Sequence, residues 1–330
     1  MRFEKIDLLK DIYYSSQYSN LYSNDNVEIH RYFLQNNNDI VLDIGVKKPI
    51  ETIGRIKLNE IYYDVETTYG YGGFFSVSHE NSLREKLFNQ YVEYCKERKI
   101  IAEFFRFHPL NNFPQTNSGL FDFVTLDREV VYVDLIKNTE ERWADYSSTT
   151  RNILRKCRKD LKIELSDNIQ QFKKMYYETM DRNQASDFYY FKEDYFNMLL
   201  KINGVYLLSV SYESKVIAMA FIMLGQDIGH YHLSANKTNY IKLNANYLIL
   251  DEAFELGKAK GMKIFMLGGG RTNQPDDSLL NFKKKFSKLT LPYYIGGKIF
   301  LPEVFSEYNR LWREQSVTDA KYFLKYRLPL

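Results

Sequence analysis

The chain has 330 residues, which exceeds the size at which a single hydrophobic core usually stops growing, so we expect two domains or two fused halves. Its composition, 45% hydrophobic and 26% charged, is typical of a soluble globular protein. The net charge of +3 excludes general electrostatic binding of nucleic acid, so any phosphate site must be local.

Cysteine content and hydropathy indicate the compartment. Cys95 and Cys157 show no pairing pattern, which favours a reducing environment, and their neighbours suggest no zinc site, so no metal is expected. The amino terminus, MRFEKIDLLKDIYY, is charged throughout and lacks the apolar region of a secretory signal. The longest apolar run, 216–224, is far shorter than the ~20 residues that a membrane helix requires. The sequence therefore predicts a cytoplasmic protein without a membrane span.

The first half contains strand patterns followed by one strongly amphipathic helix. The helix is expected over 83–98, because its apolar residues form one stripe and its charges lie opposite. The expected strands lie at 41–45, 62–73 and 74–77 before the helix and at 100–107 after it, and the loop HPLNN follows.

The second half repeats this order of elements. Strands are expected over 205–224 and 229–235, a helix over 245–260, a strand over 263–267, and then the loop GGGRTN. The two copies are roughly 165 residues apart, so internal duplication explains the chain length. We accordingly predict an amino-terminal half at 1–139 and a second half at 140–330.

A basic helix is expected to open the second half, over 140–162. It carries Arg151, Arg155, Arg158 and Lys162 at helical spacing. This stripe is either a solvated helix face or a phosphate-binding surface, since the arginine fork can grip phosphate oxygens with two nitrogens. Further basic residues that could complete such a site are Lys283, Lys284, Lys285 and Lys288.

The segment FMLGGGRTNQPDDSLLNFKKKF, at 265–286, joins a buried strand to three glycines and then to charges of both signs. Gly268, Gly269 and Gly270 form either a tight turn or a site that a ligand approaches closely. The neighbouring charged residues are Arg271, Asp276, Asp277 and Lys283. We expect Asp277 to cap the following helix and Asp276 to bind an amine.

His230 and His232 are candidates for acid–base chemistry, because strand alternation turns both to one face. His232 is the preferred base, since it lies closer to the strand end; the alternative for either residue is a hydrogen-bonded core histidine. Asn244 and Asn246 begin the long second-half helix, where their amides either hold a carbonyl or phosphate group or, for Asn244, cap the helix.

Polar and aromatic residues elsewhere suggest substrate contacts. Tyr69 and Tyr71 lie in a glycine-rich loop that suits a sugar or nucleotide, because the phenol rings can stack on such a ligand and their hydroxyls can form hydrogen bonds with it. Arg106 and His108 are expected to approach the same cleft, although Arg106 could equally form a surface ion pair. The segment 180–190 contributes Tyr189 and Tyr190, either along an acceptor channel or as part of a connector.

Taken together, these segments resemble the GNAT acyltransferase fold as it is doubled in the Fem family, the peptidoglycan-bridge aminoacyltransferases. The segments that carry the resemblance are VETTYGYGGFF at 65–75, RFHPLNN at 106–112, TRNILRKCRK at 150–159, YHLSA at 231–235, and LGGG followed by DSLLNFKKKF. The resemblance covers about 30–315. It implies an α/β (α+β) fold of two fused GNAT-like halves, each a mixed, mostly antiparallel sheet flanked by helices.

The resemblance also implies an activity, the transfer of an acyl group. An acetyl-CoA-dependent member would place a glycine-rich turn before its long helix, but 239–248, NYIKLNANYL, has no glycine. The donor is therefore either acyl-CoA or aminoacyl-tRNA, and the acceptor a glycan or nucleotide sugar. No cysteine or serine has a recognisable nucleophile setting, which favours direct attack by the acceptor amine.

The sequence thus predicts an N-acyltransferase that moves an aminoacyl or acyl group onto an amine of a cell-envelope glycan or its nucleotide-linked precursor. The alternative is a non-catalytic glycan-binding or scaffold protein that retains the GNAT fold.

Overall fold

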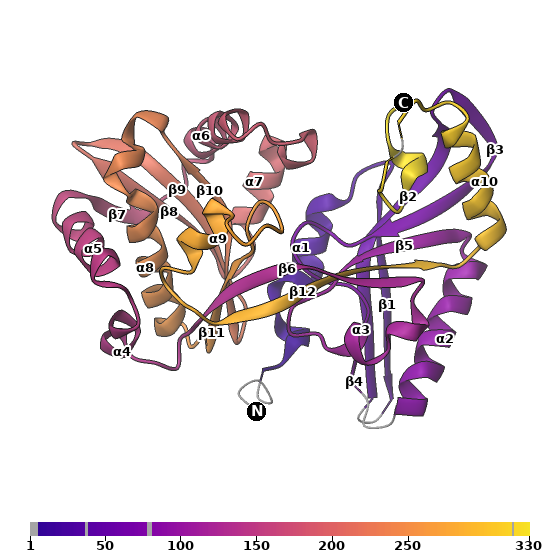
Figure 1. The fold of residues 1–330 in the computed structure, drawn as a ribbon, viewed down its shortest axis with the longest axis horizontal. Helices are drawn as coiled ribbons and strands as arrows, with labels where there is room; N and C mark the ends of the chain where they lie inside the picture. The colour runs from indigo at the N-terminus through magenta and orange to yellow at the C-terminus, as the bar shows by residue number, and fades with distance from the viewer. Residues whose placement is uncertain (1–5, 37–38, 78–80, 319) are drawn as a thin grey trace. The chain divides into compact units, whose positions relative to one another are not determined.

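A computed structural model describes residues 6–36, 39–77, 81–318 and 320–330 of the chain (Figure 1). The chain divides into two compact units, each assembled from separated stretches. Unit 1 comprises Met1–Leu21 and Arg128–Leu291, and unit 2 comprises Tyr22–Asp127 and Pro292–Leu330. The division predicted between residues 139 and 140 falls inside unit 1, because each unit is assembled from two stretches that are separated in the sequence.

Unit 2 is built on a mixed, mostly antiparallel sheet. Its strands, in the order in which they pair, are β1 (Glu28–Asn36), β2 (Asp39–Ile53), β3 (Ile56–Glu66), β5 (Ile100–Arg106) and β12 (Thr290–Ile299), and β4 (Phe75–Val77) pairs with β2. Only the β3–β5 pairing is parallel among these. The helices are α2 (Asn81–Glu97), α3 (Phe113–Thr116), α10 (Pro302–Arg313) and the 3-10 turns η4 (Ser118–Leu120) and η7 (Lys325–Arg327).

Two apolar clusters cover the two faces of this sheet. One contains Phe88, Tyr91 and Cys95 of α2 together with buried residues of the strands. The other contains Tyr308 and Trp312 of α10. Each helix therefore supplies one buried stripe, which is what its periodic apolar residues dictate.

The strands of unit 1 also pair in both parallel and antiparallel senses. Its strands, in pairing order, are β6 (Phe123–Asp134), β11 (Ile264–Gly268), β10 (Ile228–Asn236), β9 (Lys215–Leu224), β8 (Val205–Tyr212) and β7 (Lys162–Leu165). Its helices are α1 (Ser16–Ser19), α4 (Thr139–Ala144), α5 (Ser148–Asp160), α6 (Ile169–Arg182), α7 (Glu193–Leu200), α8 (Ala245–Ala259) and α9 (Ser278–Lys283). The 3-10 turns are η1 (Leu8–Lys10), η2 (Ile12–Tyr14), η3 (Asn20–Tyr22), η5 (Asp187–Tyr189) and η6 (Thr238–Leu243).

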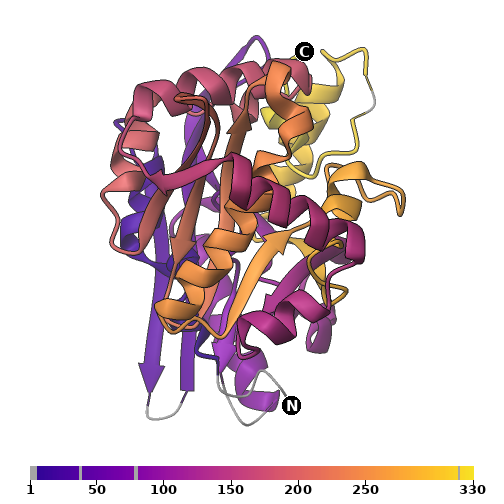
Figure 2. The same ribbon diagram turned by 90° about the vertical axis from the view of Figure 1, so that its left-hand side faces the viewer.

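The two faces of the unit 1 sheet are covered by different elements. Helices α5 and α8 pack on one face, where Leu154 and Phe254 join the main apolar cluster (Figure 2). Helices α6 and α7 pack on the other, where the ring of Phe172 lies 4.7 Å from that of Phe221. Within the described residues, no helix is both long and apolar enough to cross a membrane.

The basic helix predicted over 140–162 is two helices. Asn138 and Glu141 form a capping box that starts α4, and Ser147 caps α5 by accepting from the N–H of Thr150 at 3.1 Å. Lys162 lies in strand β7 and therefore does not belong to the basic face of the helix, contrary to the prediction from the sequence. The periodicity indicated helix correctly but did not show the break between Ala144 and Ser148.

Candidate functional site

The amino terminus of α8 lacks a side-chain cap. Asn244 precedes it with a left-handed backbone, φ 58°, and its Nδ2 donates to the carbonyl of Lys242 at 3.1 Å instead of serving the helix. The capping role considered for Asn244 is therefore not the one its side chain performs. Asparagine tolerates this backbone, so the turn forms without the glycine that the sequence lacks.

Asn246 lies in the first turn of α8. Its Oδ1 is buried and has no hydrogen-bond partner among the described residues. The first N–H groups of a helix point away from it and carry its positive dipole end. This fifteen-residue helix thus presents donors suited to a phosphate or a developing oxyanion.

The glycine loop after β11 is organised by one carboxylate. Asp277 caps α9, as predicted, by accepting from the N–H groups of Leu279 and Leu280, both at 2.9 Å. Its other oxygen accepts from the N–H groups of Arg271 and Thr272 and from the Thr272 hydroxyl, at 3.0–3.1 Å. Burial alone would raise its pKa, but these donors lower the pKa to about 2.

The glycines themselves leave no empty space. Gly268 has φ 77°, which favours glycine. A Cβ on Gly269 would lie 2.7 Å from Arg128 Cδ, and one on Gly270 would lie 2.5 Å from Asp277 Oδ1. The triplet is therefore a tight turn whose missing side chains make room for Arg128 and Asp277.

Lys283 lies beneath this loop. Its side chain is buried, and Nζ donates to the carbonyl of Gly269 at 2.6 Å. Burial lowers its pKa to about 7; Asp277 opposes this shift and Arg128 adds to it. Lys283 can therefore exchange a proton near neutral pH, unlike an ordinary surface lysine.

The glycine loop and the start of α8 are linked through α9. The ring of Tyr247, in the first turn of α8, lies 5.1 Å from that of Phe282. Lys285 Nζ donates to the Tyr247 hydroxyl at 2.9 Å. Lys284 pairs with Glu129 at 3.1 Å, and Lys288 is exposed. The structure thus joins α9 and the segment after it to the uncapped start of α8 through Phe282 and Lys285, while Lys283 contacts the glycine loop.

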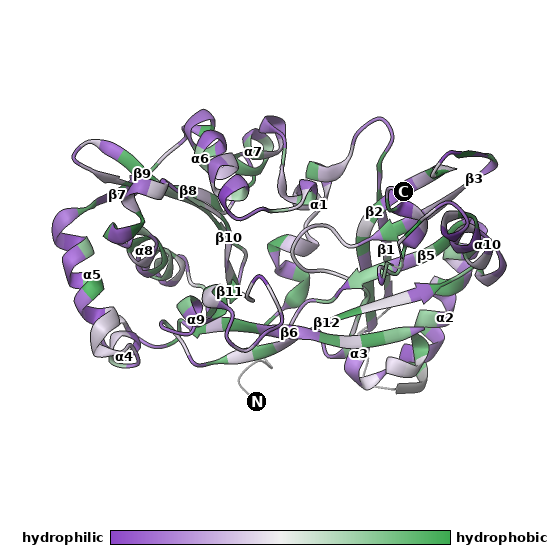
Figure 3. Ribbon diagram, turned by 45° about the horizontal axis from the view of Figure 1, so that its top comes forward, coloured by the Kyte–Doolittle hydropathy of each residue, from purple (hydrophilic) through white to green (hydrophobic). Residues whose placement is uncertain are grey.

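Helix α5 borders the same helix start, since Cys157 Sγ lies 3.4 Å from the carbonyl of Leu243. Figure 3 shows α5 as largely hydrophilic. Arg151 donates to the carbonyls of Trp143, Ala144 and Tyr146, and so serves the end of α4. Arg158 pairs with the buried Asp251 at 2.6 Å. Arg155 is exposed and contacts Asn152.

His230 and His232 lie on one face of β10, as expected, and both are buried. His232 Nδ1 lies 3.1 Å from the Tyr13 hydroxyl, and Nε2 lies 3.0 Å from the Tyr195 hydroxyl. Burial lowers the pKa of His232 to about 3, with a further contribution from His230. His230 Nε2 contacts Asp11 at 2.7 Å.

These histidines are on the opposite sheet face from α8. Tyr231, between them, packs against the cluster that contains α8, and successive strand residues point to opposite faces. No sequence pattern identifies the residues that contact the two histidines, because these partners come from distant parts of the chain. They are Asp11, Tyr13 and Tyr195.

The remaining residues that the sequence singled out in unit 1 are more exposed. Asp276 and Arg271 lie on the surface of the glycine loop, where Arg271 Nη2 contacts Ser278 Oγ at 3.2 Å. Tyr189 is exposed, and the Tyr190 hydroxyl donates to Asp181 at 2.6 Å, a bond that raises its pKa to about 12.

Unit 2 brings together most of its predicted residues. Tyr71 packs against His108, with ring centroids 5.3 Å apart, and Tyr69 is part of the same loop. The N–H of Gly72 donates to the carbonyl of Arg106 at 2.9 Å. Arg106 also pairs with Glu66 at 2.7 Å and donates to the carbonyl of Thr67 at 2.9 Å, so its guanidinium orders this loop.

Comparison with known proteins identifies the fold. No protein-family model and no curated protein sequence matches the chain. A crystal structure of FemX matches with a TM-score of 0.69 at 14% identity, covering 91% of this chain and 94% of FemX. The C-terminal domain of a putative lysylphosphatidylglycerol synthetase from Agrobacterium fabrum matches with a TM-score of 0.51 at 16% identity, covering 84% and 88%.

A conserved protein of unknown function from Bacteroides thetaiotaomicron matches with a TM-score of 0.50 at 11% identity, covering 82% of this chain and 86% of that one. At such identities the likeness establishes the fold. The predicted Fem-like α/β fold is confirmed, since the chain shares the fold of FemX.

Proposed function

We propose that this protein is an N-acyltransferase that moves an acyl or aminoacyl group onto an amine of a cell-envelope glycan or of its nucleotide-linked precursor. The observation that carries the proposal is the buried Lys283, with its pKa of about 7, in an element that packs against the uncapped start of α8. The fold shared with FemX supports the same reaction class. The donor is acyl-CoA or aminoacyl-tRNA.

Each step of the reaction has a candidate group. The acceptor nitrogen attacks the acyl carbon, and the N–H groups of α8 with Asn246 stabilise the oxyanion that forms. The neutral amine of Lys283 takes the proton that the attacking nitrogen loses. The bond to the donor's sulfur or ribose oxygen then breaks, and the Lys283 ammonium gives its proton to that leaving group, which restores the neutral amine. Asp276, exposed on the loop, binds the acceptor ammonium.

His232 has a different role in this proposal. Both of its ring nitrogens contact tyrosine hydroxyls, so it positions Tyr13 and Tyr195. The sequence-based choice of His232 as the base is thus replaced by Lys283, which offers a more suitable pKa.

The reaction is tested by incubating the protein with acetyl-CoA or alanyl-tRNA and with amine-bearing nucleotide sugars, and by mass spectrometry of the acceptors. We expect an acylated acceptor with one of the donors, and much less of it with the Lys283→Met variant. Intact-protein mass spectrometry with donor alone tests direct attack, because an acylated protein would show a covalent intermediate instead. Thermal stabilisation by a glycan with no transfer from either donor would favour the glycan-binding alternative.

A further inference from the structure

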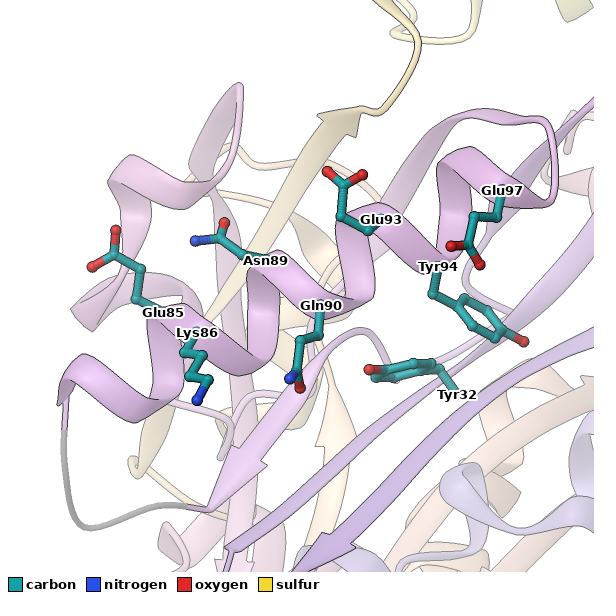
Figure 4. A pocket seen from close by; sticks show the side chains of 8 residues that line it. All are labelled: Tyr32, Glu85, Lys86, Asn89, Gln90, Glu93, Tyr94 and Glu97. Carbon is teal, nitrogen blue, oxygen red and sulfur yellow. The ribbon is translucent and has the colours of Figure 1, made fainter.

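The groove in unit 2 that Figure 4 shows carries exposed charges of both signs. Tyr32 and seven residues of α2 line its volume of about 650 Å³, and Arg98 Cζ lies 3.7 Å from the centre of the Tyr94 ring. Exposed charges of opposite sign screen one another and contribute little. A buried cation beside a second cation is a different case, because the two charges repel each other more strongly where water is excluded.

Such a pair of cations lies at the glycine loop of unit 1. Lys283 Nζ donates to the carbonyl of Gly269 at 2.6 Å, and Arg128 Nη1 donates to the carbonyl of Gly270 at 2.8 Å. Two neighbouring carbonyl groups of the loop therefore hold the two charges. Lys283 is only 7% exposed, so little water screens its charge from that of Arg128.

The backbone fixes the position of Arg128 beside this loop. Arg128 belongs to β6, which pairs with β11 as far as Val131 and Gly268. Its aliphatic stem crosses Gly269, where a Cβ would lie 2.7 Å from Cδ and 3.2 Å from Cγ of the arginine. A side chain at residue 269 would therefore displace Arg128, so this glycine is needed for the placement of the cation as well as for the turn.

Two charged groups act on Lys283. Burial lowers its pKa to about 7, Asp277 opposes the shift, and Arg128 adds to it. Asp277 does not pair with the lysine, because its oxygens accept five hydrogen bonds from the loop and from α9, and Lys283 donates to Gly269. The other charged residues nearby contact other groups or are exposed, and they are Glu129, Arg271, Asp276, Lys284 and Lys285.

We propose that Arg128 is a positioning residue for acyl transfer, whose permanent positive charge keeps Lys283 neutral until the acceptor nitrogen gives up its proton. This inference rests on the proposed function, in which Lys283 is the base. Arginine stays protonated throughout and exchanges no proton itself. Its repulsion opposes the ammonium form of Lys283, and so it also favours the return of that proton to the leaving group.

The first test is the pKa of Lys283 in variants of Arg128, measured by NMR of isotope-labelled lysine side chains. The resonance that Lys283→Met removes gives the assignment. Arg128→Met keeps an apolar stem on Gly269 and removes the charge, so we expect the pKa of Lys283 to rise from about 7 to about 8. Arg128→Lys keeps the charge and should leave the pKa near 7. Arg310→Met removes an exposed cation from α10 and should change nothing.

The second readout is the pH dependence of transfer. At pH 7, a rise of this size lowers the neutral fraction of Lys283 from about one half to about one tenth. We therefore expect kcat/KM of Arg128→Met to be about fivefold lower at pH 7 and normal at pH 9. A purely structural role for Arg128 would instead lower kcat/KM equally at both pH values.

The outcomes separate this inference from the proposed function. An unchanged pKa of Lys283 in Arg128→Met, or an equal rise in Arg128→Lys, overturns the role of Arg128 even if the protein transfers acyl groups. A rise confined to Arg128→Met, in a protein that transfers no acyl group, supports the electrostatic link between the two residues and counts against the proposed function alone.

Discussion

Asp277 shapes the glycine loop, because its one carboxylate accepts five hydrogen bonds. Four come from backbone N–H groups of the loop and of α9 that would otherwise be unsatisfied, and the fifth comes from the Thr272 hydroxyl. Its pKa of about 2 is below the value in an unfolded chain. Its stabilising contribution is therefore complete above pH of about 4 and is lost as the pH falls toward 2.

Gly270→Ala is expected to destabilise the protein by about 1–3 kcal/mol, because the new Cβ would lie 2.5 Å from Asp277 Oδ1 and displace the cap. Gly119→Ala is the matched control, since a Cβ there meets nothing within 4 Å. Urea unfolding of both variants checks this prediction. Equal stability of the two would show that the loop moves aside without loss.

The lowered pKa of Lys283 leads to a prediction for the pH dependence of acyl transfer. If its neutral amine is the base, kcat/KM rises with pH through about 7 and then levels. Lys283→Met should remove this rise and most of the activity, and Lys283→Arg should not restore it, because arginine keeps its proton. Lys288→Met, in the same segment but exposed, is the control. An unchanged pH profile in Lys283→Met would assign the proton transfer to another group.

The sequence shows which residue types the site contains but not how deeply each side chain is buried. FKKKF contains three adjacent lysines, and only packing makes Lys283 buried, Lys284 half-buried and Lys285 exposed. The same limit applies to His232, whose tyrosine partners come from the amino-terminal segment and from α7. Asp277 was predictable, because a helix cap is a local feature.

At the scale of elements, α2 joins the sheet of unit 2 through a buried acidic cluster. The Tyr91 hydroxyl lies 3.1 Å from Asp43 and also contacts Glu103, and His30 Nε2 lies 3.0 Å from the same hydroxyl. Burial raises the pKa of Asp43 to about 6 and, together with the charge of Asp43, raises that of Glu103 well above its usual range. Burial lowers the pKa of His30 to about 3, so it supplies no compensating charge.

The two carboxyl groups of this cluster predict that unit 2 loses stability as the pH rises above about 4, whereas His30, whose pKa is lowered from 6.5 to about 3, acts in the opposite sense between these two values. Because the folded carboxyl groups hold protons that the unfolded chain releases near pH 4, stability falls as the pH rises through the folded pKa values, by up to about 1.4 kcal/mol per pH unit for one proton. Glu103→Gln should flatten this fall between pH 5 and 8, and the exposed Glu51→Gln should not. Urea unfolding across this range measures both. A slope unchanged in Glu103→Gln contradicts the assignment.

Elements with a strong local period were predictable from the sequence. Helices α2 and α8 were placed within two residues at each end, and β8 and β9 were recognised as strands. Strand β12 was not predicted, since Pro292, Gly296 and Gly297 interrupt its pattern. The break between α4 and α5 was missed because the basic stripe begins only at Arg151, beyond the break, and therefore gave no information about 143–150.

At the scale of the whole molecule, duplication of the fold does not divide the chain into two consecutive pieces. Residues 292–330 complete unit 2, and the amino-terminal segment completes unit 1. Sequence periodicity records the order of elements along the chain, whereas unit membership depends on strand pairing and on cores formed between distant residues.

This arrangement makes a prediction about fragments. Fragment 1–139 lacks Tyr308 and Trp312, which pack with Ile50 and Ile101 in one core of unit 2. Each large buried side chain contributes about 1.5–3 kcal/mol, and a domain's total stability is about 5–15 kcal/mol, so this fragment should not fold. A chain that joins 22–127 to 292–330 through a short linker restores that core and should unfold cooperatively in urea. Cooperative unfolding of fragment 1–139, observed by circular dichroism and tyrosine fluorescence, would show instead that the amino-terminal half is a unit on its own.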